Sequence, residues 1–209
     1  MENPEKVPKI PGEAGTPRIP RALLILHPGF EEIEAVTPVD LLRRAGVDVV
    51  MASLGPDLFV AGGRAVVFRA DVLLADLGDS PESDFDMLIL PGGPGVKALR
   101  ENAGRHRAVV RLTQRFHGGK KWIAAICAAP LLLRDAGLAG NLRMTSFPGE
   151  ADALRPHVRA YVEDRVVLDA HVVTARGAGT SEEFSLALIA LLARASVAED
   201  IRRRIVARP

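Results

Sequence analysis

The single cysteine of this chain, Cys127, lies between two patterns that differ in their expected secondary structure. The apolar residues 122–126 before it are typical of a buried strand, and the small and apolar residues 128–133 after it are typical of a helix. A strand that turns sharply into a helix can hold a nucleophile, and the free N–H groups of a helix N-terminus favour a thiolate. The pattern predicts a reactive thiol, and the alternative is an inert buried cysteine.

The reactivity of this thiol depends on its pKa. An ordinary cysteine, with a pKa of about 8.5, is only about 3% ionised at neutral pH. Each unit by which the pKa falls favours the thiolate by about 1.4 kcal/mol, so a fall of about two units would ionise most of the side chain. We expect the turn at Cys127 to lower the pKa in this way.

Three acidic residues, Glu31, Glu32 and Glu34, follow the first predicted strand and are candidates for setting the protonation state of the thiol. Glu34 has apolar neighbours in the sequence, so it is the least solvent-facing of the three. A buried carboxyl group keeps its proton, can donate a hydrogen bond to a thiolate, and would share one proton with it. The alternative is an ordinary acidic residue in the first turn of a helix.

A glycine-rich loop, residues 91–95, follows another apolar strand. The N–H groups of Gly92 and Gly93, with that of Ala128, could stabilise the oxyanion that forms when a thiolate attacks a carbonyl carbon. The alternative is a tight turn that needs positive φ angles. The loop is not a dinucleotide-binding motif, because no G-x-G-x-x-G pattern follows the first strand.

The histidines do not indicate a metal site. None of the five shows the spacing of metal ligands, and with one cysteine a zinc or iron site is not expected. His27 ends the first predicted strand near the proposed site. We interpret it as a structural or substrate-lining residue, and the alternative is a proton carrier.

The elements that must position these residues alternate between strands and helices. This order predicts an α/β fold with a doubly wound, mostly parallel sheet and helices on both faces. Sites in such sheets form at the carboxyl ends of the strands, where residues 27–34, the glycine-rich loop and Cys127 would meet. Strands are predicted at residues 21–27, 47–53, 85–90, 121–126 and 143–146, helices at 31–45, 96–102, 105–116, 128–133 and 184–193, the last capped by Thr180 or Ser181, and hairpins at 58–68 and 165–175.

The composition limits the class of protein. The chain has 209 residues, of which 48% are hydrophobic and 25% charged, as expected for one α/β domain. Its 27 basic and 26 acidic residues give a net charge of +1, so charge does not indicate a nucleic acid or membrane partner. No apolar run is long enough to span a membrane. One cysteine cannot form an internal disulfide, which favours a cytoplasmic location.

The two ends of the chain differ from the rest. Residues 1–20 contain five prolines and no signal-peptide pattern, which predicts a flexible extension outside a domain of residues 21–209. Arg202, Arg203 and Arg204 are interpreted as a solvated helix face, and the alternative is a contact patch.

Five segments resemble the ThiJ/PfpI superfamily, in the YajL-like branch that includes a Parkinson-disease-associated protein deglycase. They are HPGFEEIEAVTPVDLLRRAG, DMLILPGGPG, AAICAAP, LRMTSFP and ARGAGTSEEF, in family order. The resemblance implies a flavodoxin-like sandwich related to the class I glutamine amidotransferases. It also implies a homodimer with the first long helix at the interface.

The resemblance implies roles for individual residues. Cys127 would be the reactive, easily oxidised cysteine and Glu34 its protonated partner, while Gly93 and Ala128 would supply amides around an oxyanion or oxidised sulfur. No metal or organic cofactor is implied. The family's activities are conversion of methylglyoxal to lactate, removal of early glyoxal adducts from proteins, and redox-linked chaperone action.

Two residues depart from patterns within the superfamily. Ala128 follows the cysteine where protease-like members have histidine, which argues against proteolysis. Phe147 stands where the human-type branch has histidine, so a Cys–Glu pair would work without that proton carrier. General acid–base catalysis contributes about 10² to 10⁴ in rate, so we expect a slow enzyme. Candidates for substrate-lining residues are His27, Phe147, Arg64 and Arg176.

These observations lead to three hypotheses. The first is a cofactor-free enzyme for methylglyoxal, glyoxal or their early protein adducts, in which Cys127 attacks an aldehyde or hemithioacetal carbon and Glu34 transfers the proton. The second is an oxidative-stress sensor and redox-linked chaperone, in which Cys127 is oxidised to a sulfinate. The third is a family member that has lost its activity.

Overall fold

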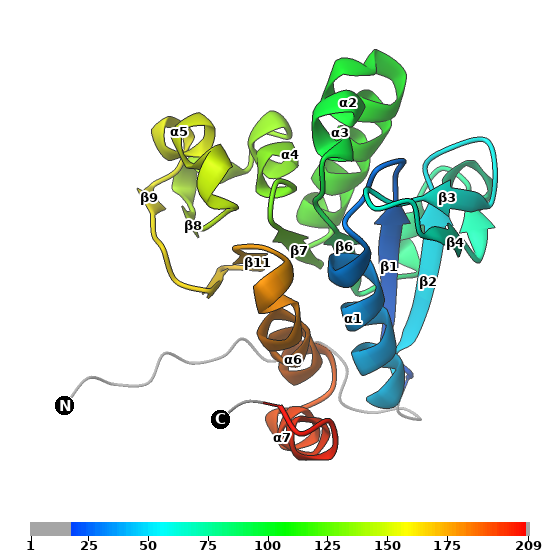
Figure 1. The fold of residues 1–209 in the computed structure, drawn as a ribbon, viewed down its shortest axis with the longest axis vertical. Coiled ribbons are helices and arrows are strands. Elements are labelled where there is room, and N and C mark those ends of the chain that lie inside the picture. Colours follow the sequence, from blue (N-terminus) through cyan, green and yellow to red (C-terminus); the bar gives the residue numbers. More distant parts are fainter. Residues whose placement is uncertain (1–17, 208–209) are drawn as a thin grey trace.

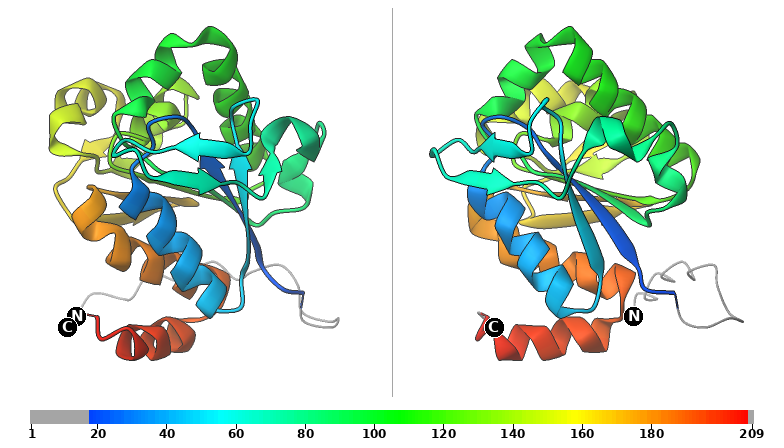
Figure 2. Two further views of the ribbon diagram at one scale, coloured as in Figure 1. Left: turned by 45° about the vertical axis from the view of Figure 1, so that its right-hand side comes forward. Right: turned by 90° about the vertical axis from the view of Figure 1, so that its right-hand side faces the viewer.

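The computed structural model describes residues 18–207, which form a sheet between two layers of helices (Figures 1 and 2). Neighbouring strands of the central sheet are parallel, except that residues 166–169 pair with residues 172–175 in antiparallel orientation. The predicted doubly wound, mostly parallel sheet is therefore confirmed. In this part of the chain the central sheet has seven strands, in the order β10 (Val166–Asp169), β11 (Val172–Ala175), β7 (Trp122–Ile126), β6 (Met87–Leu90), β1 (Arg21–Leu26), β2 (Asp48–Ser53) and β5 (Val72–Leu73).

Helices cover both faces of this sheet (Figure 2). One face packs against α1 (Glu32–Arg44) and α6 (Ser181–Leu192), and α7 (Ala195–Arg204) packs against α6. The other face packs against α2 (Gly95–Glu101), α3 (Ala103–Gly118) and α4 (Pro130–Asp135), and α5 (Ala151–Leu154) contacts α4.

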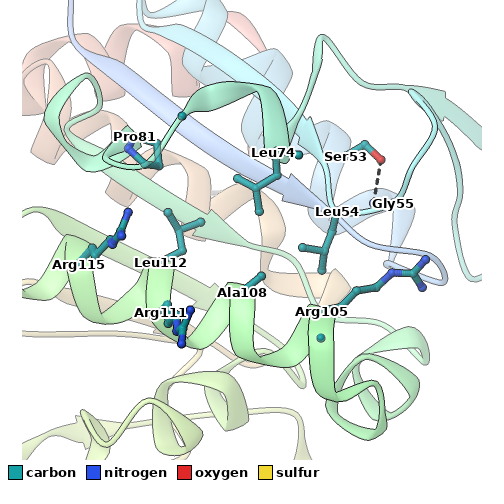
Figure 3. A pocket seen from close by; sticks show the side chains of 13 residues that line it. Ser53, Leu54, Gly55, Leu74, Pro81, Arg105, Ala108, Arg111, Leu112 and Arg115 are labelled. Carbon is teal, nitrogen blue, oxygen red and sulfur yellow. Dashed lines mark hydrogen bonds between the residues drawn. The ribbon is translucent and has the colours of Figure 1, made fainter.

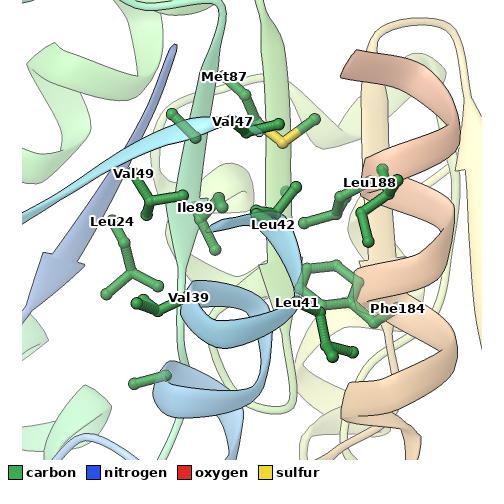
Figure 4. Packing of buried hydrophobic residues seen from close by; sticks show 14 of the residues in the cluster. Leu24, Val39, Leu41, Leu42, Val47, Val49, Met87, Ile89, Phe184 and Leu188 are labelled. Carbon is green, nitrogen blue, oxygen red and sulfur yellow. The ribbon is translucent and has the colours of Figure 1, made fainter. Parts of the chain in front are cut away.

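The core explains why the strands are apolar without interruption. Successive side chains of a strand point to opposite faces, and in β1 both faces are covered. Leu24 belongs to the cluster under α1 and α6, and Leu23 to the cluster under α2, α3 and α4. Figure 4 shows Leu24 and Ile89 of the sheet beside Val39 and Leu42 of α1, with Phe184 of α6 next to Leu41.

Two small sheets lie outside the central one. β3 (Phe59–Ala61) and β4 (Val67–Arg69) form an antiparallel hairpin, as predicted for residues 58–68. The other small sheet pairs β8 (Arg143–Met144) with β9 (Ala160–Tyr161) in parallel. The second predicted hairpin is β10 and β11, whose antiparallel pairing is confirmed.

Three helical details differ from the sequence prediction. The helix expected from residue 128 begins at Pro130, because residues 127–129 form a turn. Neither candidate caps α6: the Thr180 hydroxyl donates to the Gly177 carbonyl at 2.8 Å, and the buried Ser181 hydroxyl has no hydrogen-bond partner within residues 18–207. The helix α7 was expected only as the helix face of Arg202, Arg203 and Arg204, without bounds for the whole element.

The ends of the described chain bear on the domain prediction. Most of the predicted extension, residues 1–17, lies outside the described residues. Pro20 already belongs to the fold, since its carbonyl accepts a hydrogen bond from the Asp48 N–H at 2.9 Å. Arg204 is exposed in α7 and pairs with Asp200 one turn earlier, as expected for a solvated helix face. The described part of the chain contains no helix with the length and apolarity needed to cross a membrane.

The strand order reverses between β1 and β6. From β1 the chain continues to β2 on one side of the sheet, whereas β6 lies on the other side and leads to β7. The connecting helices α1 and α2 therefore leave β1 and β6 on opposite faces and open a crevice at the carboxyl ends of these strands.

Candidate active site

Three segments that follow neighbouring strands meet at this crevice. The segment after β1 carries Glu34 in the first turn of α1, the loop after β6 carries Gly92 and Gly93, and the turn after β7 carries Cys127. A hydrogen bond from the Glu31 N–H to the Gly92 carbonyl, at 3.0 Å, joins the first two segments. The convergence expected from the strand pattern is therefore present.

Cys127 lies at a strained turn. Its φ angle of 64° is in the left-handed region, which residues other than glycine rarely adopt. Two hydrogen bonds hold this conformation, one from its N–H to the Ala175 carbonyl at 2.9 Å and one from the Phe147 N–H to its carbonyl at 2.8 Å. The sharp elbow predicted between strand and helix is confirmed.

Polar groups surround the Cys127 sulfur. The backbone N–H groups of Gly93 and Ala128 face it and lower its pKa, and the Glu34 side chain lies close enough to raise it. Sγ of Cys127 and Oε1 of Glu34 each lie 3.9 Å from the point that a Cβ on Gly177 would occupy. The missing side chain at Gly177 therefore leaves room beside the pair.

Glu34 is completely buried. Its Oε2 accepts a hydrogen bond from the Gly92 N–H at 2.9 Å. Its Oε1 has no nitrogen or oxygen partner within residues 18–207, which leaves the Cys127 sulfur as its polar neighbour. An ordinary solvent-facing helix acid would not have these surroundings.

The two glycines of the loop differ in their contacts. The prediction that the Gly92 amide faces an oxyanion does not hold, because this N–H binds the Glu34 carboxyl group. Gly92 matters for its missing side chain, since a Cβ there would lie 2.7 Å from Cβ of Cys127. Gly93, with a φ of 106°, presents its N–H to the sulfur, as predicted.

Burial raises the pKa of both members of the Cys–Glu pair. Desolvation raises the pKa of Glu34 to about 7, against the lowering effect of hydrogen bonds from Cys127 and Gly92. Desolvation, and then the charge of Glu34, raise the pKa of Cys127 to about 12, against the two amides. The low thiol pKa expected from a helix N-terminus is therefore not found. A proton on Glu34 would remove the repulsion between the two groups, but burial, the larger cause, would still oppose the thiolate.

Of the candidates for lining the site, Phe147 lies beside the pair formed by Cys127 and Glu34. The Phe147 ring is 48% exposed and lies 3.6 Å from the Cβ position of Gly177. The buried His27 ring contacts the carbonyls of Pro28 and Pro91 at 3.2 and 3.3 Å, and burial lowers its pKa. His27 therefore links two loops of the site, which is the structural environment that the sequence analysis favoured over a proton carrier.

The side chains of the two candidate arginines form hydrogen bonds with residues outside the Cys–Glu pair. The Arg176 guanidinium donates to the Glu163 carbonyl at 2.8 Å, and the Arg64 side chain donates to the Gly63 carbonyl at 3.1 Å. Neither of these hydrogen bonds reaches Cys127 or Glu34, so they do not support a lining role for the two side chains.

Glu32, which the sequence analysis named as a candidate partner of the thiol beside Glu31 and Glu34, has a structural environment. Its carboxylate is buried and accepts hydrogen bonds from the N–H groups of Arg64 at 2.6 Å and Val66 at 3.4 Å, which attaches α1 to the β3–β4 hairpin. Burial alone would raise the pKa of Glu32, but these hydrogen bonds lower it below the ordinary value. No local pattern distinguishes Glu32 from Glu31.

A cleft of about 560 Å³ begins at the two residues whose amides face the sulfur, Gly93 and Ala128. Lys97 and Glu150 also line it, so the cleft carries charges of both signs. Within residues 18–207, no three His, Cys, Asp or Glu side chains are grouped closely enough to hold a metal ion.

The fold and this site define a class of protein, the flavodoxin-like α/β proteins with a cysteine at a strained strand-to-helix elbow and a buried glutamate beside it. The model of the DJ-1/PfpI family matches residues 20–191, and the chain belongs to this family. The resemblance to the ThiJ/PfpI superfamily is thereby confirmed.

Known relatives cover nearly the whole chain. The Parkinson disease protein 7 homolog of Danio rerio is 38% identical over 189 residues, which are 89% of this chain and 96% of that protein. The glutathione-independent glyoxalase DJR-1.2 of Caenorhabditis elegans is 35% identical over 174 residues, 82% of this chain and 88% of that protein. The crystal structure of Drosophila melanogaster DJ-1beta matches with a TM-score of 0.83 at 33% identity, covering 92% of this chain and 100% of that one.

Proposed function

We propose that this protein is a cofactor-free, cysteine-dependent enzyme that acts on methylglyoxal, glyoxal or their early adducts with proteins. The contact between Cys127 and the buried Glu34 carries this proposal, with two backbone amides aimed at the same sulfur. The similarity to a protein named as a glutathione-independent glyoxalase supports it. A cytoplasmic location stays a prediction.

The first steps follow from the geometry of the pair. The thiol proton moves to Glu34, and the thiolate forms a bond to the aldehyde carbon while the carbonyl electron pair moves to oxygen. The N–H groups of Gly93 and Ala128 stabilise this oxyanion, and Glu34 returns the proton to it, which gives a hemithioacetal. A group with a pKa near 7 can both accept and donate a proton at neutral pH. The raised pKa of Cys127 makes the first transfer uphill, which agrees with the slow turnover expected from the sequence.

The product then forms without an external oxidant or reductant. Glu34 accepts the proton of the former aldehyde carbon while the neighbouring carbonyl oxygen takes up a proton, which gives an enediol. Glu34 then returns its proton to the neighbouring carbon, and the hydroxyl group on the first carbon releases a proton as its carbonyl bond forms. The first carbon is thereby oxidised to a thioester and the second is reduced to an alcohol. Water cleaves the thioester, which releases lactate and restores the thiol. The cleft next to Gly93 and Ala128 gives room for a larger adduct.

Replacing Cys127 by alanine tests this function. We expect lactate formation from methylglyoxal to fall to the uncatalysed rate, because no other described residue supplies a thiol. Lactate is measured with time, and Cys127→Ser serves as a variant of similar shape with a much weaker nucleophile. Thermal unfolding of each variant shows whether the fold is kept. Equal rates in wild-type and Cys127→Ala protein would refute the proposal.

A second candidate function is sensing of oxidative stress, coupled to chaperone action. The Gly93 and Ala128 amides that face the sulfur could bind the oxygens of a sulfinate, which favours this candidate. Formation of a sulfinate consumes two peroxide molecules, each of which transfers one oxygen atom to the sulfur. A gain of two oxygens on Cys127 in mass spectra, together with equal lactate rates in the experiment above, would favour the sensor over the enzyme.

We also propose that the protein forms a homodimer through α1 and the β3–β4 hairpin, which Glu32 connects. The helix α1 and the β3–β4 hairpin carry exposed apolar side chains, and such side chains mark an interaction surface when they lie together. They are Ile33 (50% exposed), Val36 (45%), Phe59 (68%), Val66 (52%) and Val67 (59%).

Replacing Val36 by arginine is expected to convert this dimer to a monomer, because a charge without a partner would be buried at the interface. Size-exclusion chromatography with light scattering measures the mass. Leu168→Arg is the matched control, since Leu168 is 47% exposed on β10, away from this surface. A wild-type monomer, or a dimer in the Val36→Arg variant, would contradict the proposed interface.

A further inference from the structure

A second pocket lies between α3 and the residues that follow β5 (Figure 3). Its volume is about 360 Å³, within the range of about 300 to 1,000 Å³ of small-molecule sites. It shares no lining residue with the cleft at Gly93 and Ala128. The pocket is therefore separate from the proposed reaction.

The walls of this pocket are mostly apolar. Leu54 and Leu74 lie opposite Leu112 of α3, as Figure 3 shows. Two of the α3 residues that line the pocket, Gly104 and Ala108, are small, which keeps the space open. The other wall is held by two short 3₁₀ turns, at Leu74–Leu77 and Pro81–Ser83.

Three arginines of α3 also line the pocket: Arg105, Arg111 and Arg115. Elsewhere in the molecule, arginines such as Arg100 and Arg134 form ion pairs with carboxylates. The guanidinium groups of the three pocket arginines form no ion pair or hydrogen bond with residues 18–207. The wall segment contains acidic residues, including Asp76 and Asp79, but none of them lines the pocket. Arg105 is half-buried and Arg111 and Arg115 are exposed, so three solvated guanidinium groups border the apolar space.

The spacing of these arginines suggests how a ligand would lie. Arg111 and Arg115 are four residues apart, so they are neighbours on the helix surface. Arg105 is ten residues from Arg115, about 15 Å along the helix axis. Figure 3 shows Arg115 toward Pro81 and Arg105 toward Gly55, with Leu112 and Ala108 between them. A charged group at one end and an apolar body along the middle would match this arrangement.

We propose that this pocket binds an amphipathic anion, a chain or ring system of about ten carbon atoms with one carboxylate or phosphate group. Guanidinium groups bind both kinds of anion through paired hydrogen bonds, so Arg111 and Arg115 would hold the head group. The apolar body would be buried against Leu54, Leu74 and Leu112.

Calorimetric titration of the full chain tests the proposal, with decanoate and decyl phosphate as probes. We expect at least one of them to bind, and the double variant Arg111→Gln/Arg115→Gln to bind it at least about 10-fold more weakly, since charged hydrogen bonds are lost. Arg107→Gln is the matched control, because Arg107 is exposed on the same helix and does not line the pocket. Ala108→Trp, which fills the space, should also abolish binding, whereas Cys127→Ala should not change it.

Other outcomes define the limits of the proposal. Binding of only one probe would identify the head group, carboxylate or phosphate. No binding of either probe, or an equal loss in the Arg107→Gln control, would overturn the site. Equal binding of decanol would overturn the role of the arginines, and equal binding of inorganic phosphate would overturn that of the apolar walls.

Discussion

The Glu34→Gln variant is expected to be more stable than the wild type above pH 7 and to lose turnover of methylglyoxal. Burial raises the pKa of Glu34 from 4.5 to about 7, so the folded protein binds a proton that the unfolded chain releases. The stability of the wild type is therefore fully present below pH 4.5 and falls as the pH rises to about 7. Above pH 7 the ionised, buried carboxylate lowers the free energy of unfolding by about 3 kcal/mol. Glutamine carries no charge, so the variant does not lose this stability.

The same substitution separates thiol reactivity from catalysis. Glutamine removes the negative charge beside Cys127 and can donate an amide hydrogen to the sulfur, so the pKa of the thiol should fall. Alkylation by iodoacetamide at pH 7 should become faster than in the wild type. Turnover should nevertheless fall by about 10² to 10⁴, because glutamine cannot accept a proton.

Three measurements check these expectations: urea unfolding at pH 5 and pH 8, the rate of alkylation, and the rate of lactate formation. Glu101→Gln, an exposed carboxylate change on α2, should leave the pH dependence of stability unaltered. Unchanged turnover in Glu34→Gln would exclude Glu34 as the proton carrier. Slower alkylation of Cys127 in the variant than in the wild type would show that the carboxyl group does not raise the pKa of Cys127.

The Gly92→Ala variant is expected to lose both stability and activity. The added Cβ would lie 2.7 Å from Cβ of Cys127 and 2.7 Å from the Ile126 carbonyl oxygen, closer than real contacts allow. The loop and the elbow must then move apart, at a cost of about 1 to 3 kcal/mol. The movement also shifts the N–H that binds Glu34, so the Cys–Glu contact is lost.

Thermal unfolding and the lactate assay measure both effects. Gly118→Ala is the control, since Gly118 ends α3 and a Cβ there would meet no atom within 4 Å. Alanine is a better helix former than glycine, so this control should be as stable as the wild type or more stable by up to about 1 kcal/mol. A Gly92→Ala variant with the stability and activity of Gly118→Ala would contradict the steric argument.

The fold could be predicted because its signals are local. β6 and β7 are apolar throughout, and β1 is apolar after Arg21, since the sheet is covered on both faces. Helix periodicity after β1 predicted residues 31–45, against the observed Glu32–Arg44. The polar helix α7 gave no such signal, because only two of its residues, Ala198 and Ile201, are buried.

The site could be predicted only in part, because its details depend on contacts between distant segments. The elbow follows from the residues around Cys127, and the proximity of Glu34 follows from strand topology and family resemblance. Nothing local shows that the Gly92 amide turns to the carboxyl group, or that the thiol is buried deeply enough for its pKa to rise. Both depend on how the loops of three strands pack together.

The donors that face the Cys127 sulfur belong to the main chain. A mutation in codon 128 replaces the methyl group of Ala128 by another side chain. Every replacement except proline keeps the backbone N–H that faces the sulfur. A change at codon 34 or 127, in contrast, removes a reacting group outright. Inherited variation should therefore inactivate this site through a few codons, those for Cys127, Glu34 and the loop glycines, while neighbouring positions drift with much less effect on the chemistry.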